Sequence, residues 1–271
     1  GFGTGNTLGI ASLFPGANVH GVEIDKNVLK FSKWFTDWNH DVLQRPNTQM
    51  FIQDGRAFLR WSKTRYDVII MEPMSPLQAG VVSLYSKEFY ELALNHLKED
   101  GILVQWLPLH LVGREDARSI ASTFKNVFPE TSIWNSFLTR IVLLIGSREK
   151  VFIDKNIFDA RLESPEIKKV AEEMKVMSFL DFADFFITDG NQLSAFLEGA
   201  EVISDDKPIL EFSRVSLLPS MKWETDESFL NMLRHRINQK PPVMGLEDSE
   251  QELFDRNFKI RTAQRLGVFS R

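Results

Sequence analysis

Short apolar segments alternate with amphipathic segments through the first half of the chain, and this alternation constrains the fold most strongly. The apolar segments have strand length, whereas the segments between them carry apolar residues at helical spacing. Two of the apolar segments, 66–73 and 101–107, are nearly continuous, as is typical of strands buried on both faces of a sheet. The alternation predicts an α/β fold, a mostly parallel sheet with helices on both of its faces.

The remaining elements of this half follow from the same patterns. Ser86 is a good N-cap and Gly101 a good C-cap for the helix between them. The segments 131–137 and 140–147 lie close enough to form an antiparallel hairpin at the edge of the sheet. The other strands are expected at 17–25 and 48–55, and the other helices at 27–43, 56–63 and 114–128.

The pattern changes after residue 150. Two helices, 164–175 and 179–187, are expected with no strand between them, followed by a strand at 207–215. We therefore predict three parts of the chain. These are a core at 1–150, a helical segment with a returning strand that packs on the core at 151–222, and a helical tail at 223–271 that is broken at 240–242.

Composition excludes several classes of function. The chain has no cysteine, which rules out disulfides, thiolate catalysis and cysteine-ligated metal. Its five histidines show no zinc-binding spacing, and no metal is expected. The net charge of −5 argues against a dedicated nucleic-acid binder. No apolar run approaches the ~18 residues that a membrane-spanning helix needs.

The chain opens with "GFGTG", a glycine-rich turn of the kind that follows a strand and precedes a helix. Glycines let backbone N–H groups approach a bound ligand. The spacing of Gly1, Gly3 and Gly5 differs from the GxGxxG of dinucleotide sites. No strand stands before the loop, so we expect the first strand of the core to be missing from this chain. The alternative is a purely structural turn.

Three acids end the expected strands, where the ligand crevice of an open α/β sheet lies. Glu23 stands 18 positions after Gly5, suited to accept hydrogen bonds from both ribose hydroxyls, or it is a solvated strand end. Asp54, before Gly55, could accept from an adenine amino group, cap the helix that follows, or do both. Glu72 ends a buried strand, where burial would raise its pKa toward that of a proton acceptor; the alternative is a structural acid with a partner.

Several motifs together resemble the spermidine synthase family of polyamine aminopropyltransferases. They are "GFGTG", "VEIDKNVL", "DGRAFL", "YDVIIMEPMSP" and "SLYSKEFYELALNHLKEDGILVQW". The resemblance covers about the first 150 residues and is densest from 22 to 106. A later "DDKPILEF", at 205–212, is similar to a motif of a divergent bacterial branch that is often fused to membrane segments.

The resemblance implies a class I methyltransferase-like (Rossmann-like) fold. It also implies transfer of an aminopropyl group from decarboxylated S-adenosylmethionine to a small-molecule amine. The family's ribose acid falls on Glu23, its adenine-side acid on Asp54, its catalytic base on Glu72, and a glutamine after the next strand on Gln105. The carboxylate would orient the amine and take its proton, and the sulfonium, already a good leaving group, needs no metal.

Two departures from the family weaken the case for a diamine. Thr4 and Ser75 stand where the family has acids beside the cationic groups. Asp205 and Asp206 could restore negative charge if their loop folds over the site, although a solvated turn is the simpler interpretation. The alternatives are therefore a methyltransferase that uses intact S-adenosylmethionine, and a non-catalytic nucleotide-binding domain.

The resemblance also sets expectations for partners and location. It implies a homodimer. We expect a cytoplasmic enzyme or the cytoplasmic domain of a membrane-fused protein, with no membrane contact by this chain itself. The amine acceptor is left open by the sequence.

Overall fold

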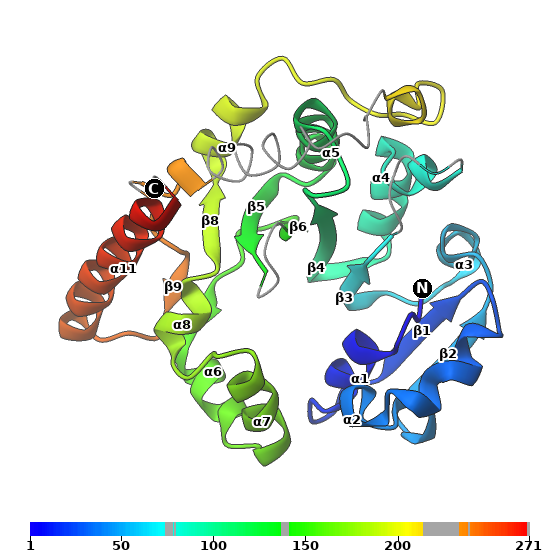
Figure 1. Ribbon diagram of the computed structural model, residues 1–271, viewed down its shortest axis with the longest axis horizontal. Coiled ribbons are helices and arrows are strands. Elements are labelled where there is room, and N and C mark those ends of the chain that lie inside the picture. The colour runs from blue at the N-terminus through cyan, green and yellow to red at the C-terminus, as the bar shows by residue number, and fades with distance from the viewer. Residues whose placement is uncertain (74–77, 79, 137–140, 214–232, 238, 270–271) are drawn as a thin grey trace. The chain divides into compact units, whose positions relative to one another are not determined.

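The computed structural model describes residues 1–73, 78, 80–136, 141–213, 233–237 and 239–269 (Figure 1). These residues form two compact units. Unit 1 comprises Gly1–Lys63 and Asn156–Met177, and unit 2 comprises Thr64–Lys155 and Ser178–Arg271. The three-part division expected from the sequence stays a prediction.

Unit 1 is built on a two-stranded parallel sheet. β1 (Val19–Glu23) pairs with β2 (Thr48–Ile52), so that both strands end at the same edge. The sheet carries α1 (Asn6–Ser12) before it and α3 (Gly55–Trp61) after it, both at expected positions. The helix expected at 164–175 is confirmed as α7 (Pro165–Glu173), preceded by the unexpected α6 (Lys155–Leu162).

The single helix expected at 27–43 is wrong. The segment instead forms η1 (Val28–Trp34), α2 (Thr36–Asn39) and η2 (Val42–Gln44). His40 and Asp41 both adopt φ of 53°, a left-handed conformation that ends α2 before η2 begins. Apolar spacing alone does not register such a break.

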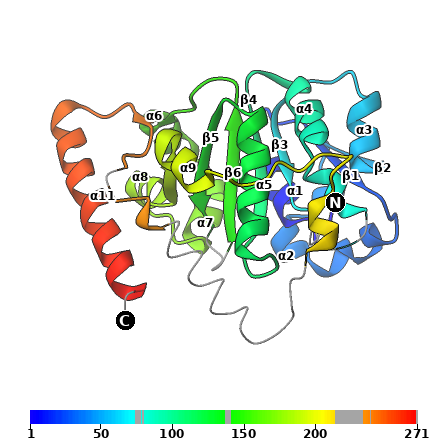
Figure 2. The same cartoon turned by 90° about the horizontal axis from the view of Figure 1, so that it is seen from above.

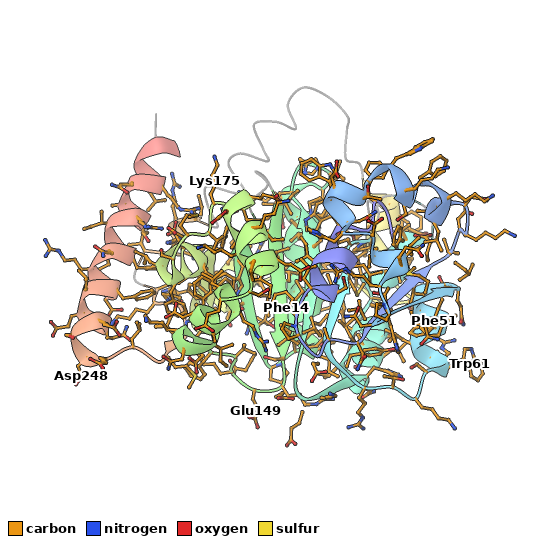
Figure 3. The ribbon with its side chains drawn as sticks, turned by 90° about the horizontal axis from the view of Figure 1, so that it is seen from below. Phe14, Phe51, Trp61, Glu149, Lys175 and Asp248 are labelled. Atoms are coloured by element: carbon orange, nitrogen blue, oxygen red, sulfur yellow. The ribbon has the colours of Figure 1, made fainter. Side chains whose placement is uncertain are left out.

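Two apolar contacts stabilise unit 1. One joins α1 to α7 through Leu13, Ile167 and Val170. The other joins β2 to α3, with the ring centroids of Phe51 and Phe58 4.7 Å apart. Trp61, at the end of α3, is 78% exposed and points away from the ribbon in Figure 3.

Unit 2 is built on a mixed five-stranded sheet in the order β3-β4-β6-β5-β8. β3 and β4 pair in parallel, whereas the pairs β4–β6, β6–β5 and β5–β8 are antiparallel. The hairpin of β5 and β6 is confirmed, and β8 occupies part of a segment expected to be helical. The strands are β3 (Tyr66–Met71), β4 (Leu97–Pro108), β5 (Glu130–Asn135), β6 (Ile141–Ser147) and β8 (Phe186–Asp189).

Helices line one face of this sheet (Figure 2). The rings of Tyr90, Phe124 and Phe128 pack together and join α4 to α5. Up to residue 197, the described helices of unit 2 are η3 (Val81–Leu84), α4 (Lys87–Asn95), α5 (Arg114–Val127), α8 (Phe179–Ala183) and α9 (Gly190–Leu197).

Two expectations for this region need correction. Ser86 caps α4 as expected, but the helix ends at Asn95, and Gly101 lies inside β4 at an irregularity of its pairing with β3. β3 is also not buried on both faces, because Val68 and Ile70 are 47% and 46% exposed. Among the described strands of unit 2, β3 lies at the edge of the sheet.

The C-terminal part of unit 2 is helical. After the break at 240–242, β9 (Val243–Met244) pairs with β7 (Ile153–Asp154), and α11 (Asp248–Phe269) follows. The strand expected at 207–215 is wrong, because η4 (Ile209–Phe212) stands there. The start of the expected tail, near residue 223, lies outside the described residues.

A buried ion network fixes α11 to α8. Arg236 is 1% exposed and contacts both the carboxylate and the carbonyl of Asp184. Arg265 binds the other carboxylate oxygen of Asp184, and Arg261 binds Asp181. Burial lowers the pKa of Arg236 to about 10, against the opposing effect of Asp184, so the guanidinium stays charged at neutral pH.

Candidate functional site

The glycine loop of unit 1 is a tight turn that requires glycine at Gly5. Gly5 has φ of 87°, and its N–H donates to the carbonyl of Phe2 at 2.8 Å. A Cβ on Gly5 would lie 2.5 Å from the ring of Phe2. Any side chain there would displace Phe2, the one buried residue among the first four. Gly1, Gly3 and Thr4 are exposed on this turn, which leads directly into α1.

Asn39 holds the loop from α2, a contact that the sequence analysis missed. Its side chain is fully buried and donates to the carbonyls of Thr4 and Ser32, at 2.9 Å each. A Cβ on Gly9 would lie 2.2 Å from the carbonyl oxygen of Asn39, so α1 and α2 meet at this glycine. The only sequence signal for this contact is an asparagine within an aromatic-rich segment.

Glu23 joins the end of β1 to the glycine loop. Its carboxylate accepts the N–H of Phe2 at 2.6 Å and that of Asp25 at 3.0 Å. The Glu23 side chain is buried, so the alternative interpretation of Glu23 as a solvated strand end is wrong. Burial by itself raises the pKa of Glu23, but the backbone donors of Asp25 and Phe2 outweigh it and lower the pKa below 4.5. Glu23 is therefore a fixed anion at neutral pH.

Asp54 lies at the same edge of the small sheet. The N–H of Gln53 donates to the carbonyl of Glu23 at 2.9 Å, which brings the end of β2 beside the end of β1. The Asp54 carboxylate accepts the N–H of Ala57 at 2.7 Å, so its role as a helix cap is confirmed. Asp54 and Gly55 are exposed, and contact with a nucleotide stays a prediction for both.

Glu72 and Gln105 belong to unit 2, where Glu72 directly follows β3 and Gln105 lies on the neighbouring strand β4. Met71 of β3 pairs with Gln105 of β4, so Glu72 follows directly beside the glutamine. Gln105 lies inside β4 rather than after it, three residues before Pro108. Glu72 is exposed, so the expected desolvation of this carboxylate is wrong. Ser75 lies outside the described residues.

Gln105 has an unusual environment. Its side chain is fully buried, and its amide nitrogen donates to the carbonyl of Trp106 at 3.1 Å. Among the described residues, its Oε1 atom has no hydrogen-bond partner. An unsatisfied buried acceptor costs about 1–3 kcal/mol, so it calls for a ligand group or a bound water.

Asp205 and Asp206 form a solvated turn, as the simpler interpretation had it. Ser204 and Lys207 pair across the turn, and Asp205 and Asp206 at its tip are exposed. Lys207 makes an ion pair with Glu201 at 2.7 Å. Whether these aspartates bind a substrate stays a prediction.

Two features are absent from the described parts of the chain. No group of three or more His, Asp or Glu side chains there could hold a metal ion. None of the helices described combines the length and apolar character needed to cross a membrane.

The elements and their order define a class I methyltransferase-like α/β fold followed by C-terminal helices. A probable spermidine synthase from Corynebacterium glutamicum aligns over 80% of this chain and 72% of its own, with a TM-score of 0.50 and 19% identity. A spermidine synthase solved with the transition-state analogue AdoDATO aligns over 65% of this chain and 68% of its own, with a TM-score of 0.50 and 21% identity.

Sequence comparison then identifies the family. Residues 10–144 match the family model of the spermine/spermidine synthase domain, which places this part of the chain in the spermidine synthase family. The polyamine aminopropyltransferase of Saccharolobus solfataricus is 33% identical over 113 residues, which cover 41% of this chain and 38% of that protein. The polyamine aminopropyltransferase of Alkaliphilus oremlandii is 30% identical over 123 residues, which cover 45% of this chain and 43% of that protein. The chain thus spans less than half the length of these curated relatives.

Proposed function

We propose that this domain transfers an aminopropyl group from decarboxylated S-adenosylmethionine to an amine. The observation that carries the proposal is the buried Oε1 of Gln105, to which no described residue donates, beside the strand that Glu72 follows. A carbonyl oxygen accepts hydrogen bonds only, and an amine or ammonium group supplies the matching donors. The match to the family's domain and the names of the relatives support the same reaction.

Each residue then has a role that its chemistry allows. The Glu23 carboxylate, already ionised and fixed by backbone donors, would accept the ribose hydroxyls of the donor nucleotide. The glycine loop would present its backbone to the same ligand, with Asp54 and Gly55 on the adenine side. The nucleotide supplies a sulfonium leaving group.

The remaining residues have proposed roles toward the amine. The amine nitrogen forms a bond to the carbon beside the sulfonium, and the carbon–sulfur bond breaks, so that its electron pair stays on sulfur. Glu72 would take the proton that the nitrogen loses, because an alkylammonium with a pKa near ~10 must be deprotonated before it attacks. Gln105, Ser75, Asp205 and Asp206 would bind the amine.

The test is product analysis by mass spectrometry, with a panel of amines and both forms of the nucleotide. Glu72→Gln should reduce turnover by at least ~10²-fold, the range expected for loss of a general base, and leave nucleotide binding intact. Glu99→Gln, which removes an exposed acid of β4, is the control. Unchanged turnover in Glu72→Gln would remove Glu72 as the base. Nucleotide binding with no transfer to any amine would favour the non-catalytic alternative.

A methyltransferase that uses intact S-adenosylmethionine is the second candidate, and Thr4 favours it. Thr4 is uncharged and exposed on the glycine loop, where its hydroxyl donates to Asn6 at 3.1 Å. The loop therefore offers no negative charge to repel the carboxylate of intact S-adenosylmethionine. Calorimetric titration with the two nucleotides separates the candidates: a clear preference for the intact form would overturn aminopropyl transfer.

We also propose that the protein acts in the cytoplasm as a homodimer, as its resemblance to this family implies. Light scattering coupled to size-exclusion chromatography measures the oligomeric state directly. A monomer at micromolar concentration would contradict the dimer.

A further inference from the structure

Large aromatic side chains are exposed along the segment of unit 1 that joins β1 to β2. Phe31, Trp34 and Trp38 are 50%, 70% and 61% exposed. Exposed apolar residues that stand singly are ordinary on a protein surface, whereas a group of large ones marks an interaction site. These three lie within eight positions of sequence, on η1 and α2. Together with Lys30 and Lys33 we call them the Trp–Lys patch.

The geometry of η1 arranges the patch in two rows. In a 3-10 helix, side chains three positions apart lie one above the other. The rings of Phe31 and Trp34 accordingly lie 5.4 Å apart between centroids. Lys30 and Lys33 have the same spacing and are exposed, and the Nζ atom of Lys33 lies 5.9 Å from the centre of the Trp34 ring. The aromatic row and the lysine row are therefore neighbours.

The opposite face of the segment is fixed within unit 1. Ser32 is buried, and its carbonyl and hydroxyl oxygens accept hydrogen bonds from the Asn39 side chain at 2.9 Å and 3.1 Å. The same Asn39 side chain donates to the carbonyl of Thr4 in the glycine loop. The backbone that carries the patch is thus held in place before a partner binds, which lowers the entropy lost on binding.

The lysines make this segment positive in an acidic protein. Residues 26–38 contain three lysines and one aspartate, a net charge of +2, whereas the whole chain carries −5. Among the described residues, no carboxylate pairs with Lys26, Lys30 or Lys33, and Lys30 donates instead to the Asn27 side chain at 2.7 Å. The three positive charges are therefore available to an anionic partner.

The residue types favour a lipid surface over a protein partner. Lysine is depleted at protein–protein interfaces, where arginine is enriched, and residues 26–38 contain no arginine. Tryptophan with lysine is typical of segments that lie in a membrane–water interface, with the indole rings at the level of the headgroups. Positive charge adds attraction to the anionic lipids of such a surface.

We propose that the Trp–Lys patch docks unit 1 on an anionic lipid bilayer, in place of the absence of membrane contact expected from the sequence. Phe31, Trp34 and Trp38 enter the headgroup region, and the lysines contact lipid phosphates. The docking is peripheral and reversible, because three side chains bury far less apolar area than a membrane-spanning helix does. It does not depend on the proposed transfer reaction.

Sedimentation of the whole chain with vesicles tests the patch. Vesicles of phosphatidylcholine alone are compared with vesicles that also contain phosphatidylserine. Wild type should bind the second kind only, and added salt should weaken the binding because it screens the lysines. Trp34→Ala combined with Trp38→Ala should weaken binding at least about tenfold, because two large apolar side chains no longer leave water. Lys30→Gln combined with Lys33→Gln should weaken it about 20-fold, since one lysine at an anionic surface contributes about fivefold.

The matched control changes the same residue types elsewhere in unit 1. Trp61→Ala combined with Lys63→Gln removes an exposed tryptophan and an exposed lysine together. The helix α3, which ends at Trp61, lies away from α2 in both Figures 1 and 2. This control should bind vesicles as wild type does. The unfolding midpoint of every variant should stay close to wild type, because the substituted side chains are exposed.

Several results would overturn the docking. Wild type that ignores the anionic vesicles, or binds the neutral ones equally, would exclude an anionic surface as the partner. Unchanged binding in the Trp34 and Trp38 double variant, or an equal loss in the Trp61 control, would exclude the patch as the binding surface. Light scattering of the same proteins identifies a second copy as the partner: wild type would then be dimeric without binding vesicles, and the Trp34 and Trp38 double variant would be monomeric.

Discussion

Glu23 in unit 1 and Gln105 in unit 2 are both buried polar side chains at strands, but their hydrogen bonding differs. The Glu23 carboxylate accepts two backbone N–H groups and needs no ligand to be satisfied. The Gln105 carbonyl is as deeply buried, and no described residue donates to it. In the proposed function, the nucleotide end is therefore built before the ligand arrives, whereas the amine end has a buried carbonyl oxygen that no described residue donates to and that a ligand can satisfy.

The difference predicts opposite responses to substitution. Removing a hydrogen-bonded group leaves its partners without a hydrogen bond, so the stability of the fold and the binding of the ligand fall together. Removing an unsatisfied group relieves a cost, so stability holds or rises while function falls.

Glu23→Gln should damage both binding and stability. The neutral amide turns an NH2 group toward the N–H of Phe2 or Asp25 and offers weaker acceptors to ribose hydroxyls. Because hydrogen bonds to charged groups contribute about 1.5–3 kcal/mol each, nucleotide affinity should fall about a hundredfold and the free energy of unfolding by about 1–3 kcal/mol. Calorimetry and urea unfolding measure the two effects. Glu173→Gln, an exposed acid of α7, is the control. An intact affinity in Glu23→Gln would contradict a role for Glu23 in nucleotide binding.

Gln105→Met should separate the two properties. Methionine fills a similar volume without an unsatisfied carbonyl, so the free energy of unfolding should hold or rise by up to about 1 kcal/mol. Amine transfer should fall about tenfold to a hundredfold, because one hydrogen bond to the amine is lost. Urea unfolding and steady-state kinetics give the two numbers. A strongly destabilised variant with normal turnover would show that Gln105 serves the fold rather than the amine.

Local patterns predicted much of this molecule. The caps at Asp54 and Ser86, the hairpin of β5 and β6 and the strand ends at Glu23 and Glu72 each follow from residues close in sequence. Hydrogen bonds within three residues or pairing of adjacent strands determine such features. They need no knowledge of the rest of the chain.

The features that the sequence did not reveal depend on distant neighbours. Asn39 holds the glycine loop across 35 positions, and Glu211 contacts Gly80 across 131. The apolar run of β3 indicated burial on both faces, but burial is decided by what lies against each face, and Val68 is half exposed. The missing partner of Gln105 is likewise a property of the packed interior and has no sequence signal.

Acidification should weaken the Glu23 end selectively. Because the folded-state pKa of Glu23 is lowered, its stabilisation is complete above its ordinary value of 4.5 and is lost as the pH falls through the folded pKa. The difference in unfolding free energy between wild type and Glu23→Gln should therefore shrink below about pH 4.5. Urea unfolding of both proteins across this range isolates Glu23 from the other carboxylates. A difference that stays constant down to pH 3 would contradict a titrating Glu23.

Tyr90→Phe should give the smallest effect and test whether every unsatisfied buried group marks function. Tyr90 is fully buried, its hydroxyl has no partner among the described residues, and burial raises its pKa well above 10. Its ring contacts Phe124 at 5.2 Å between centroids, and phenylalanine preserves that contact. The free energy of unfolding should hold or rise by less than about 1 kcal/mol, with transfer unchanged. A loss of more than that in urea unfolding would reveal a bound water at the hydroxyl. A loss of transfer would place Tyr90 with Gln105 at the amine end, and the unmet hydrogen bond would then belong to a pair of side chains rather than to Gln105 alone.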